Sequence, residues 1–318
     1  GLYSTAIGST TGTPRQPVYT KDANGKITAI DGISVTTTGA GTDLTDIIEI
    51  NGVPVTNTEV NSFVASLSSG ANLSLGKNSI ALGTSNLAAG ESSVALGDSS
   101  KAVAKDAIAI GRNGNASGEQ AISIGAGAQA AASGALAAGG ASNAGRDGAV
   151  ALGQGAFANT TAGISIGQNA GAGTSQGTTN DRTDHIAIGR NSGQNVIGNR
   201  NIALGVGAGS NLSASGIGSS DDNIAIGVNA GSNLTGDDNI AIGRDANKNI
   251  TAVAESVAIG SSVDATTGST VLGYEAKASG GDYATVLGYK AKVTGDSGTA
   301  LGRDSEASAN NIALGASS

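Results

Sequence analysis

The sequence contains no cysteine, methionine or tryptophan, and it has only two phenylalanines and three prolines among its 318 residues. Without cysteine there is no disulfide framework and no thiolate metal site. Such a scarcity of aromatic residues argues against a globular α/β enzyme built around an aromatic core. No apolar run approaches the length of a membrane-spanning helix, and no basic stretch followed by an apolar stretch predicts a signal peptide.

The negative net charge and the scarcity of histidine exclude further classes of function. The formal net charge of -8 argues against binding to nucleic-acid phosphates. His185 is the single histidine, so a nucleophile–histidine pair or a metal site has almost nothing to build on. We therefore expect no catalytic residues, no metal and no cofactor.

The sequence is instead rich in glycine and in a four-residue signature: large aliphatic, small, large aliphatic, glycine. The signature recurs at 14-residue intervals from Ile80-Ala81-Leu82-Gly83 to Ile164-Ser165-Ile166-Gly167. It then continues at longer and more variable intervals to Ile312-Ala313-Leu314-Gly315. A fixed period of this length is typical of a solenoid.

Each signature has the alternation and the length of a short β-strand, and its glycine suits a sharp corner with positive φ. In the strict run an alanine follows five residues after each glycine, which indicates a second strand of small residues. The pattern predicts a flat, two-sided parallel β-roll. We expect the large aliphatics to face the interior and the small middle residue to face outward, where another chain approaches closely. The predicted interface residues are Ala81, Ala95, Ala109, Ser123, Ala151, Ser165, Ala187 and Ala203.

The first part of the chain departs from the repeat. Residues 1–8 already resemble a coil, whereas residues 9–70 predict an inserted α+β subdomain. Asn24-Gly25 and Asn51-Gly52 predict hairpin turns. A capping box at Thr56–Glu59 followed by an apolar stripe predicts one short helix.

The repeated signature resembles that of a known protein family. The string Asn78-Ser79-Ile80-Ala81-Leu82-Gly83 and its copies over about 71–318 are similar to the head repeat of trimeric autotransporter adhesins, the YadA-like head. The resemblance implies a left-handed parallel β-roll, a homotrimer, display at the bacterial cell surface, and a stalk and an outer-membrane anchor outside this chain. It also implies adhesion to extracellular matrix proteins of the collagen, fibronectin or laminin class, or to host cells. Asn78 and Ser79 match a leading pair that is linked to collagen binding in the family.

Other candidate ligand residues lie where the 14-residue rhythm breaks, in two 22-residue coils near 167–227. Loops on a rigid scaffold are common recognition sites. The candidates are Thr174, Gln176, Asn180, Asp181, Arg182, Asp184, Ser215 and Asp221. The aspartates also fit solvated corners, and His185 occupies a slot that holds asparagine in other coils.

Two alternative functions remain open at this stage. One is a β-helical polysaccharide-binding or -degrading protein, such as a phage tail-fibre-like lyase, which the scarcity of aromatics disfavours. The other is an ice-binding solenoid, which would need a regular threonine ladder.

Overall fold

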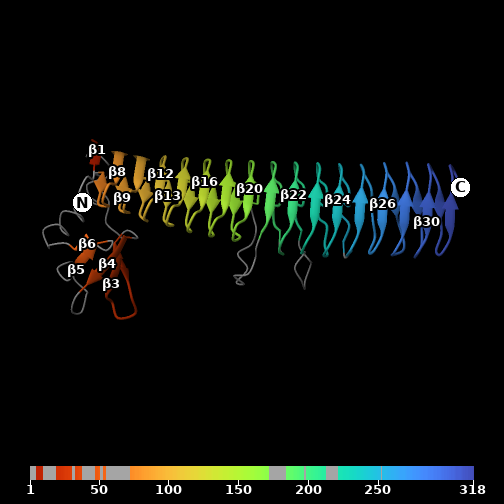
Figure 1. Cartoon of the computed structure of the whole chain (residues 1–318), viewed down its shortest axis with the longest axis horizontal. Coiled ribbons are helices and arrows are strands. Elements are labelled where there is room, and N and C mark those ends of the chain that lie inside the picture. The colour runs from red at the N-terminus through yellow and green to blue at the C-terminus, as the bar shows by residue number, and fades with distance from the viewer. Residues whose placement is uncertain are drawn as a thin grey trace. The chain divides into compact units, whose positions relative to one another are not determined.

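The computed structural model describes residues 5–9, 19–30, 33–37, 47–50, 53–54, 72–171, 184–196, 198–212, 221–251 and 253–318. The described elements are all β-strands, parallel in the repeated coils and antiparallel in β2–β6, and these residues contain no helix (Figure 1). The chain divides into two compact units, Gly1–Gly148 and Ala149–Ser318. The predicted parallel β-solenoid of about 14 residues per coil is confirmed.

In the first unit the signatures form one parallel sheet, with each anchor in register with the next: Thr5 pairs with Ile80, Ile80 with Val94, and Val94 with Ile108. Its strands are β1 (Thr5–Ser9), β8 (Ile80–Thr84), β10 (Val94–Asp98), β12 (Ile108–Ile110), β14 (Ile122–Ile124) and β16 (Leu136–Ala138). The alanine-bearing half-repeats form the second sheet: β7 (Leu73–Ser74), β9 (Leu87–Ala88), β11 (Lys101–Ala102), β13 (Asn115–Ala116), β15 (Gln129–Ala130) and β17 (Asn143–Ala144).

The second unit continues the same plan. Its signature strands are β18 (Val150–Leu152), β20 (Ile164–Ile166), β21 (Ile186–Ile188), β22 (Ile202–Leu204), β23 (Ile224–Ile226), β24 (Ile240–Ile242), β25 (Val257–Ile259), β26 (Thr270–Leu272), β28 (Thr285–Leu287), β30 (Thr299–Leu301) and β32 (Ile312–Leu314). Second strands are β19 (Phe157–Ala158), β27 (Lys277–Ala278), β29 (Lys292–Val293) and β31 (Glu306–Ala307).

The longer coils between β20 and β25 return through turns, and they fill their wider interior with aliphatic side chains. Val196, Leu212, Leu234 and Val253 form one buried cluster along these coils. The loop segments 172–183 and 213–220 lie outside the described residues.

The interior of the roll is built from small side chains, which reverses the predicted orientation of the signature. In the coil that begins at Val94, the side chains of Ala95, Ser100, Ala102 and Ala107 are each 0% exposed. Side chains alternate between the two faces of a strand, so a buried middle residue places both large neighbours outside. Four small residues per coil leave no room for a large one.

The predicted interface residues are therefore inside the roll, and the prediction that they face a neighbouring chain is wrong. Each is at most 5% exposed within a single chain: Ala81, Ala95, Ala109, Ser123, Ala151, Ser165, Ala187 and Ala203.

The signature glycine is required by its backbone and by its neighbours, as predicted for a sharp corner. Gly97 has φ +132°, and a Cβ there would lie 2.6 Å from the carbonyl oxygen of Gly111 on the next coil. The glycines thus stack backbone on backbone, at a spacing that admits no side chain.

The insert of the first unit is an antiparallel sheet of β2 (Tyr19–Lys21), β3 (Ile27–Ile30), β4 (Ile33–Thr37), β5 (Ile47–Ile50) and β6 (Val53–Pro54). Both predicted hairpins are confirmed, because β2 pairs with β3 and β5 pairs with β6. At the first turn the Asp22 carboxylate accepts hydrogen bonds from the backbone N–H groups of Asn24 and Lys26. The predicted helix at 56–67 lies outside the described residues, and the boundaries of 1–8 and 9–70 stay predictions.

The insert is anchored on the second-strand face of the first coils. Ile27, Ile30 and Ile47 form a buried cluster that includes Leu87 and Ala89 of the roll. The later coils of the first unit carry lysine, asparagine or glutamine at the position of Leu87, so within this unit only the first coils offer an apolar platform there.

Candidate functional site

The first candidate surface is the outward face of the signature strands, which we call the aliphatic face. In the first unit Ile80 and Leu82 are each 44% exposed, and in the second unit Ile226 and Leu287 are 37% and 51% exposed. Neighbouring strands lie about 4.8 Å apart, so these side chains form a continuous apolar stripe along each unit. A contiguous exposed apolar stripe of that extent marks a surface that another molecule covers.

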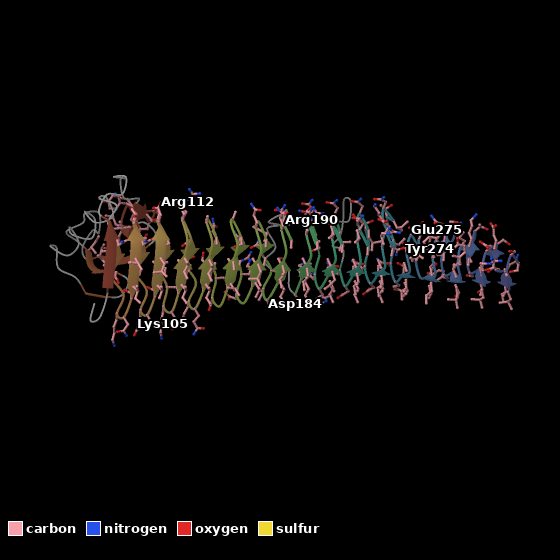
Figure 2. The ribbon with its side chains drawn as sticks, turned by 90° about the horizontal axis from the view of Figure 1, so that it is seen from above. Lys105, Arg112, Asp184, Arg190, Tyr274 and Glu275 are labelled. Carbon is pink, nitrogen blue, oxygen red and sulfur yellow. The ribbon has the colours of Figure 1, made fainter. Side chains whose placement is uncertain are left out.

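Two edges flank the aliphatic face. The glycine edge comprises the two residues after each signature glycine, and the return edge comprises the residues two and three positions before each signature. In the first unit Arg112 and Lys105 lie on opposite edges, and in the second unit Arg190 and Tyr274 lie opposite Asp184 (Figure 2).

The return edge of the second unit is strongly acidic. It carries Asp184, Asp221, Asp222, Asp237, Asp238, Glu255, Asp282 and Asp296. Arg200 is the cation on this edge, and its guanidinium donates two hydrogen bonds to the Asp222 carboxylate at 2.6 and 2.5 Å. This pairing holds the pKa of Asp222 below its ordinary value and raises that of Arg200.

The glycine edge of the second unit carries cations and aromatic rings together with three acids, Asp245, Glu275 and Asp304, and is therefore far less acidic than the return edge. Arg190, Arg244 and Arg303 occupy the first position of this edge in their coils. Tyr274 and Tyr289 occupy the same position in successive coils, and their rings stack with centroids 5.5 Å apart and planes 10° apart. The edges of the second unit therefore differ in both charge and shape.

Asparagine ladders run along the second unit, one buried and one exposed. In the slot before each signature, Asn223 hydrogen-bonds Asn201 and Asn239, so these buried asparagines link successive coils. His185 holds the same slot, with its Nε2 2.5 Å from the Gly198 carbonyl oxygen.

The sequence analysis did not predict the exposed asparagine ladder. Its members share φ between 53° and 61° and link through side-chain amides at 2.6–2.8 Å: Asn195, Asn211, Asn233 and Asn249. The Gly-x-Asn spacing of the longer coils, which becomes Asn-x-Asn at Asn249, is the sequence signal that indicates this ladder, since asparagine tolerates left-handed backbone.

The predicted ligand residues lie in different environments. Asn78 and Asp184 are exposed at return-edge corners, and Asp221 is half-buried, accepting a hydrogen bond from the Asn199 N–H at 2.8 Å. Ser79 is fully buried and donates a hydrogen bond to the Gly76 carbonyl, so its prediction as a ligand contact is wrong. The remaining candidates lie outside the described residues: Thr174, Gln176, Asn180, Asp181, Arg182 and Ser215.

No group of three or more histidine, cysteine or acidic side chains that could hold a metal ion occurs within the described ranges. Nor does that part of the chain contain a helix long and apolar enough to cross a membrane.

These features define the structural class of the protein: it is a parallel β-solenoid that keeps small residues inside and presents its large aliphatics outside. Comparison with models of known protein families then identifies a similar family. The sequence model of the YadA head domain repeat matches residues 74–100, 88–113, 147–170, 267–291, 280–305 and 294–318. These stretches are similar to the YadA head domain repeat, and their recurrence supports a YadA-like head of the trimeric autotransporter adhesin type. No curated protein matches the chain.

Proposed function

We propose that this chain is the head of a bacterial surface adhesin that works as a homotrimer, is anchored at the outer membrane in the full-length protein, and attaches without a chemical step. Its partners are extracellular matrix proteins of the collagen, fibronectin or laminin class, or the host-cell surface. The observation that carries the proposal is the aliphatic face, which is exposed along both units of the single chain.

Association around this face supports the proposal energetically. Burying a whole aliphatic side chain stabilises by about 1.5–3 kcal/mol, so each half-exposed residue offers roughly 1 kcal/mol. The contribution repeats at every coil. The sum along a unit is ample for assembly even after the entropic costs of association.

Assembly would leave the second-strand face, the outer part of both edges and the long-coil loops for ligand contact. We assign attachment to these surfaces, with Asn78, Asp184 and Asp221 among the contact residues. Three identical copies with repeated coils would make attachment multivalent, so weak single contacts would add up to firm binding.

Two measurements on the full chain test the proposal. Light scattering should give three times the mass of one chain. Immobilised collagen, fibronectin, laminin and a host-cell layer should each be compared with albumin for retention of the protein. A single-chain mass, or retention equal to that on albumin throughout the panel, would refute the corresponding part.

A further inference from the structure

Tyr283 stands out on the return edge of the second unit. Its φ is +60°, a left-handed conformation that is unusual for a bulky residue, and its side chain is 65% exposed. Elsewhere this slot holds mainly aspartate, asparagine, serine or glycine, which adopt such a backbone more readily. An exposed aromatic residue held in a disfavoured conformation points to a role outside its own coil.

The preceding coil makes room for this ring. A Cβ on Gly268 would lie 2.5 Å from the Tyr283 ring carbon Cδ1, so the ring leans over a position that only glycine leaves open. The Tyr283 ring is therefore seated on the return edge and presented outward from it.

The opposite edge holds an aromatic counterpart. The stacked rings of Tyr274 and Tyr289 are each nearly half exposed, and the Lys290 ammonium lies 5.3 Å from the Tyr289 ring centroid. Lys290 also pairs with Glu275 at 3.6 Å. Figure 2 places Tyr274 and Glu275 on the edge opposite Asp184, which occupies the same slot in its coil as Tyr283.

The heights of these residues also match. The chain climbs one coil between Tyr274 and Tyr289, and Tyr283 lies between them in sequence on the other edge. Tyr283 therefore sits at a level between the two stacked rings. Within one chain it cannot reach them, because the width of the roll separates the edges.

A closed three-fold ring around the aliphatic face brings these edges together. Its interface is heterologous, so the glycine edge of one copy meets the return edge of the next at the same height. The charges permit this contact: Asp282 and Asp296 flank Tyr283, whereas Lys290, which is paired with Glu275, accompanies the stacked pair.

We propose that Tyr283 of each copy docks against the Tyr274–Tyr289 stack of the neighbouring copy, with Lys290 facing Asp282 and Asp296, and that this seam fixes the axial register of the chains. The inference rests on the proposed homotrimer and adds the residues that align it. A register slip of one coil would move Tyr283 away from the stack and disrupt the aromatic contact.

Photochemical tyrosine cross-linking tests the seam directly. The full chain carries five tyrosines, so a Tyr3→Phe/Tyr19→Phe background leaves only the three seam residues reactive. We expect covalent dimers and trimers on a denaturing gel. Tyr283→Phe keeps the ring but should abolish these products. Coupling of Tyr274 with Tyr289 inside one chain should persist there as dityrosine fluorescence without a change in mass, which controls for reactivity.

A stability readout accompanies the cross-linking. Tyr283→Asn relieves the disfavoured backbone and should lower the dissociation temperature of the assembly, whereas Ser297→Asn, in the same slot one coil later, should leave it unchanged. A three-chain mass whose cross-links survive in Tyr283→Phe, or are absent from the background protein, would overturn the seam alone. A single-chain mass would overturn the homotrimer of the proposed function as well.

Discussion

Replacing Ala225 with leucine tests whether the middle residue of the signature faces the interior of the roll. The Ala225 side chain is 1% exposed, and the space around it is nearly filled. A Cβ built on Gly231 would lie 3.1 Å from the Ala225 Cβ, and one on Gly209 would lie 3.7 Å from it. The substitution adds three carbons where Gly231 of the same coil barely leaves room for one.

Overpacking of this kind costs about 1–3 kcal/mol. For a unit of this size each kcal/mol lowers the melting temperature by roughly 2–4 °C. The assay is thermal unfolding followed by far-UV circular dichroism, at one protein concentration so that association stays constant. Thr285→Leu is the control, because it also enlarges a signature residue but at an exposed, outward position.

The two orientations of the signature give opposite results in this experiment. With the small residue inside, Ala225→Leu melts lower and Thr285→Leu melts at the same temperature or higher. With the small residue outside, the destabilised variant would be Thr285→Leu. Parent-like melting of Ala225→Leu would therefore refute the interior of small residues described above.

The remaining predictions concern assembly, the glycine stack and acid. Ile226→Glu puts like charges on the aliphatic face of every copy, so light scattering should show a loss of the three-chain mass while the circular dichroism of the coil persists. Gly97→Ala forces a Cβ to 2.6 Å from a neighbouring carbonyl oxygen and should lower the melting temperature sharply; Gly127→Ala, with nothing within 4 Å, should cost only about 1–2 kcal/mol of backbone strain. Because Arg200 lowers the pKa of Asp222 from 3.8, their pairing stabilises the coil above that value and is lost as pH falls through the lowered pKa. Arg200→Gln should accordingly melt slightly below the parent at neutral pH and match it in strong acid.

Local physics was enough to predict the repeat and its strands. Alternation over three residues, a glycine with positive φ and a 14-residue period define the coil without reference to any distant contact. The same holds for the hairpin at Asn24-Gly25, whose turn chemistry is contained in a few residues.

Orientation could not be read from the signature because its alternation is symmetric. Ile-Ala-Ile fits a strand that buries either its two large residues or its one small residue. The deciding quantity is the volume between the two sheets. Reading all four small positions of one coil together, such as Ala95, Ser100, Ala102 and Ala107, would have shown that this volume is too small for isoleucine.

The candidate residues were predicted from the resemblance and from the breaks in the repeat: Asn78 matches the family's leading pair, and Asp184 lies in a 22-residue coil. The structure places both at corners with left-handed backbone, which asparagine and aspartate tolerate well. The stack of Tyr274 on Tyr289 joins residues one coil apart, and its meaning depends on Tyr283 on the other edge. Such contacts between residues of successive coils can be predicted from the sequence period only when it is known which face of each strand points outward.

An interior of small residues has one further consequence for function. Alanine buries little apolar area, so a single roll gains little hydrophobic stabilisation per coil compared with the cost of ordering its backbone. The large aliphatics, which could supply that stabilisation, lie outside and contribute fully only when another copy covers them. In the proposed trimer, assembly therefore adds to the stability of each folded roll, and the edges that meet when the face closes would determine which copy is accepted and at what height. A residue such as Tyr283, whose backbone conformation is disfavoured in the isolated chain, would then serve alignment and not the stability of that chain.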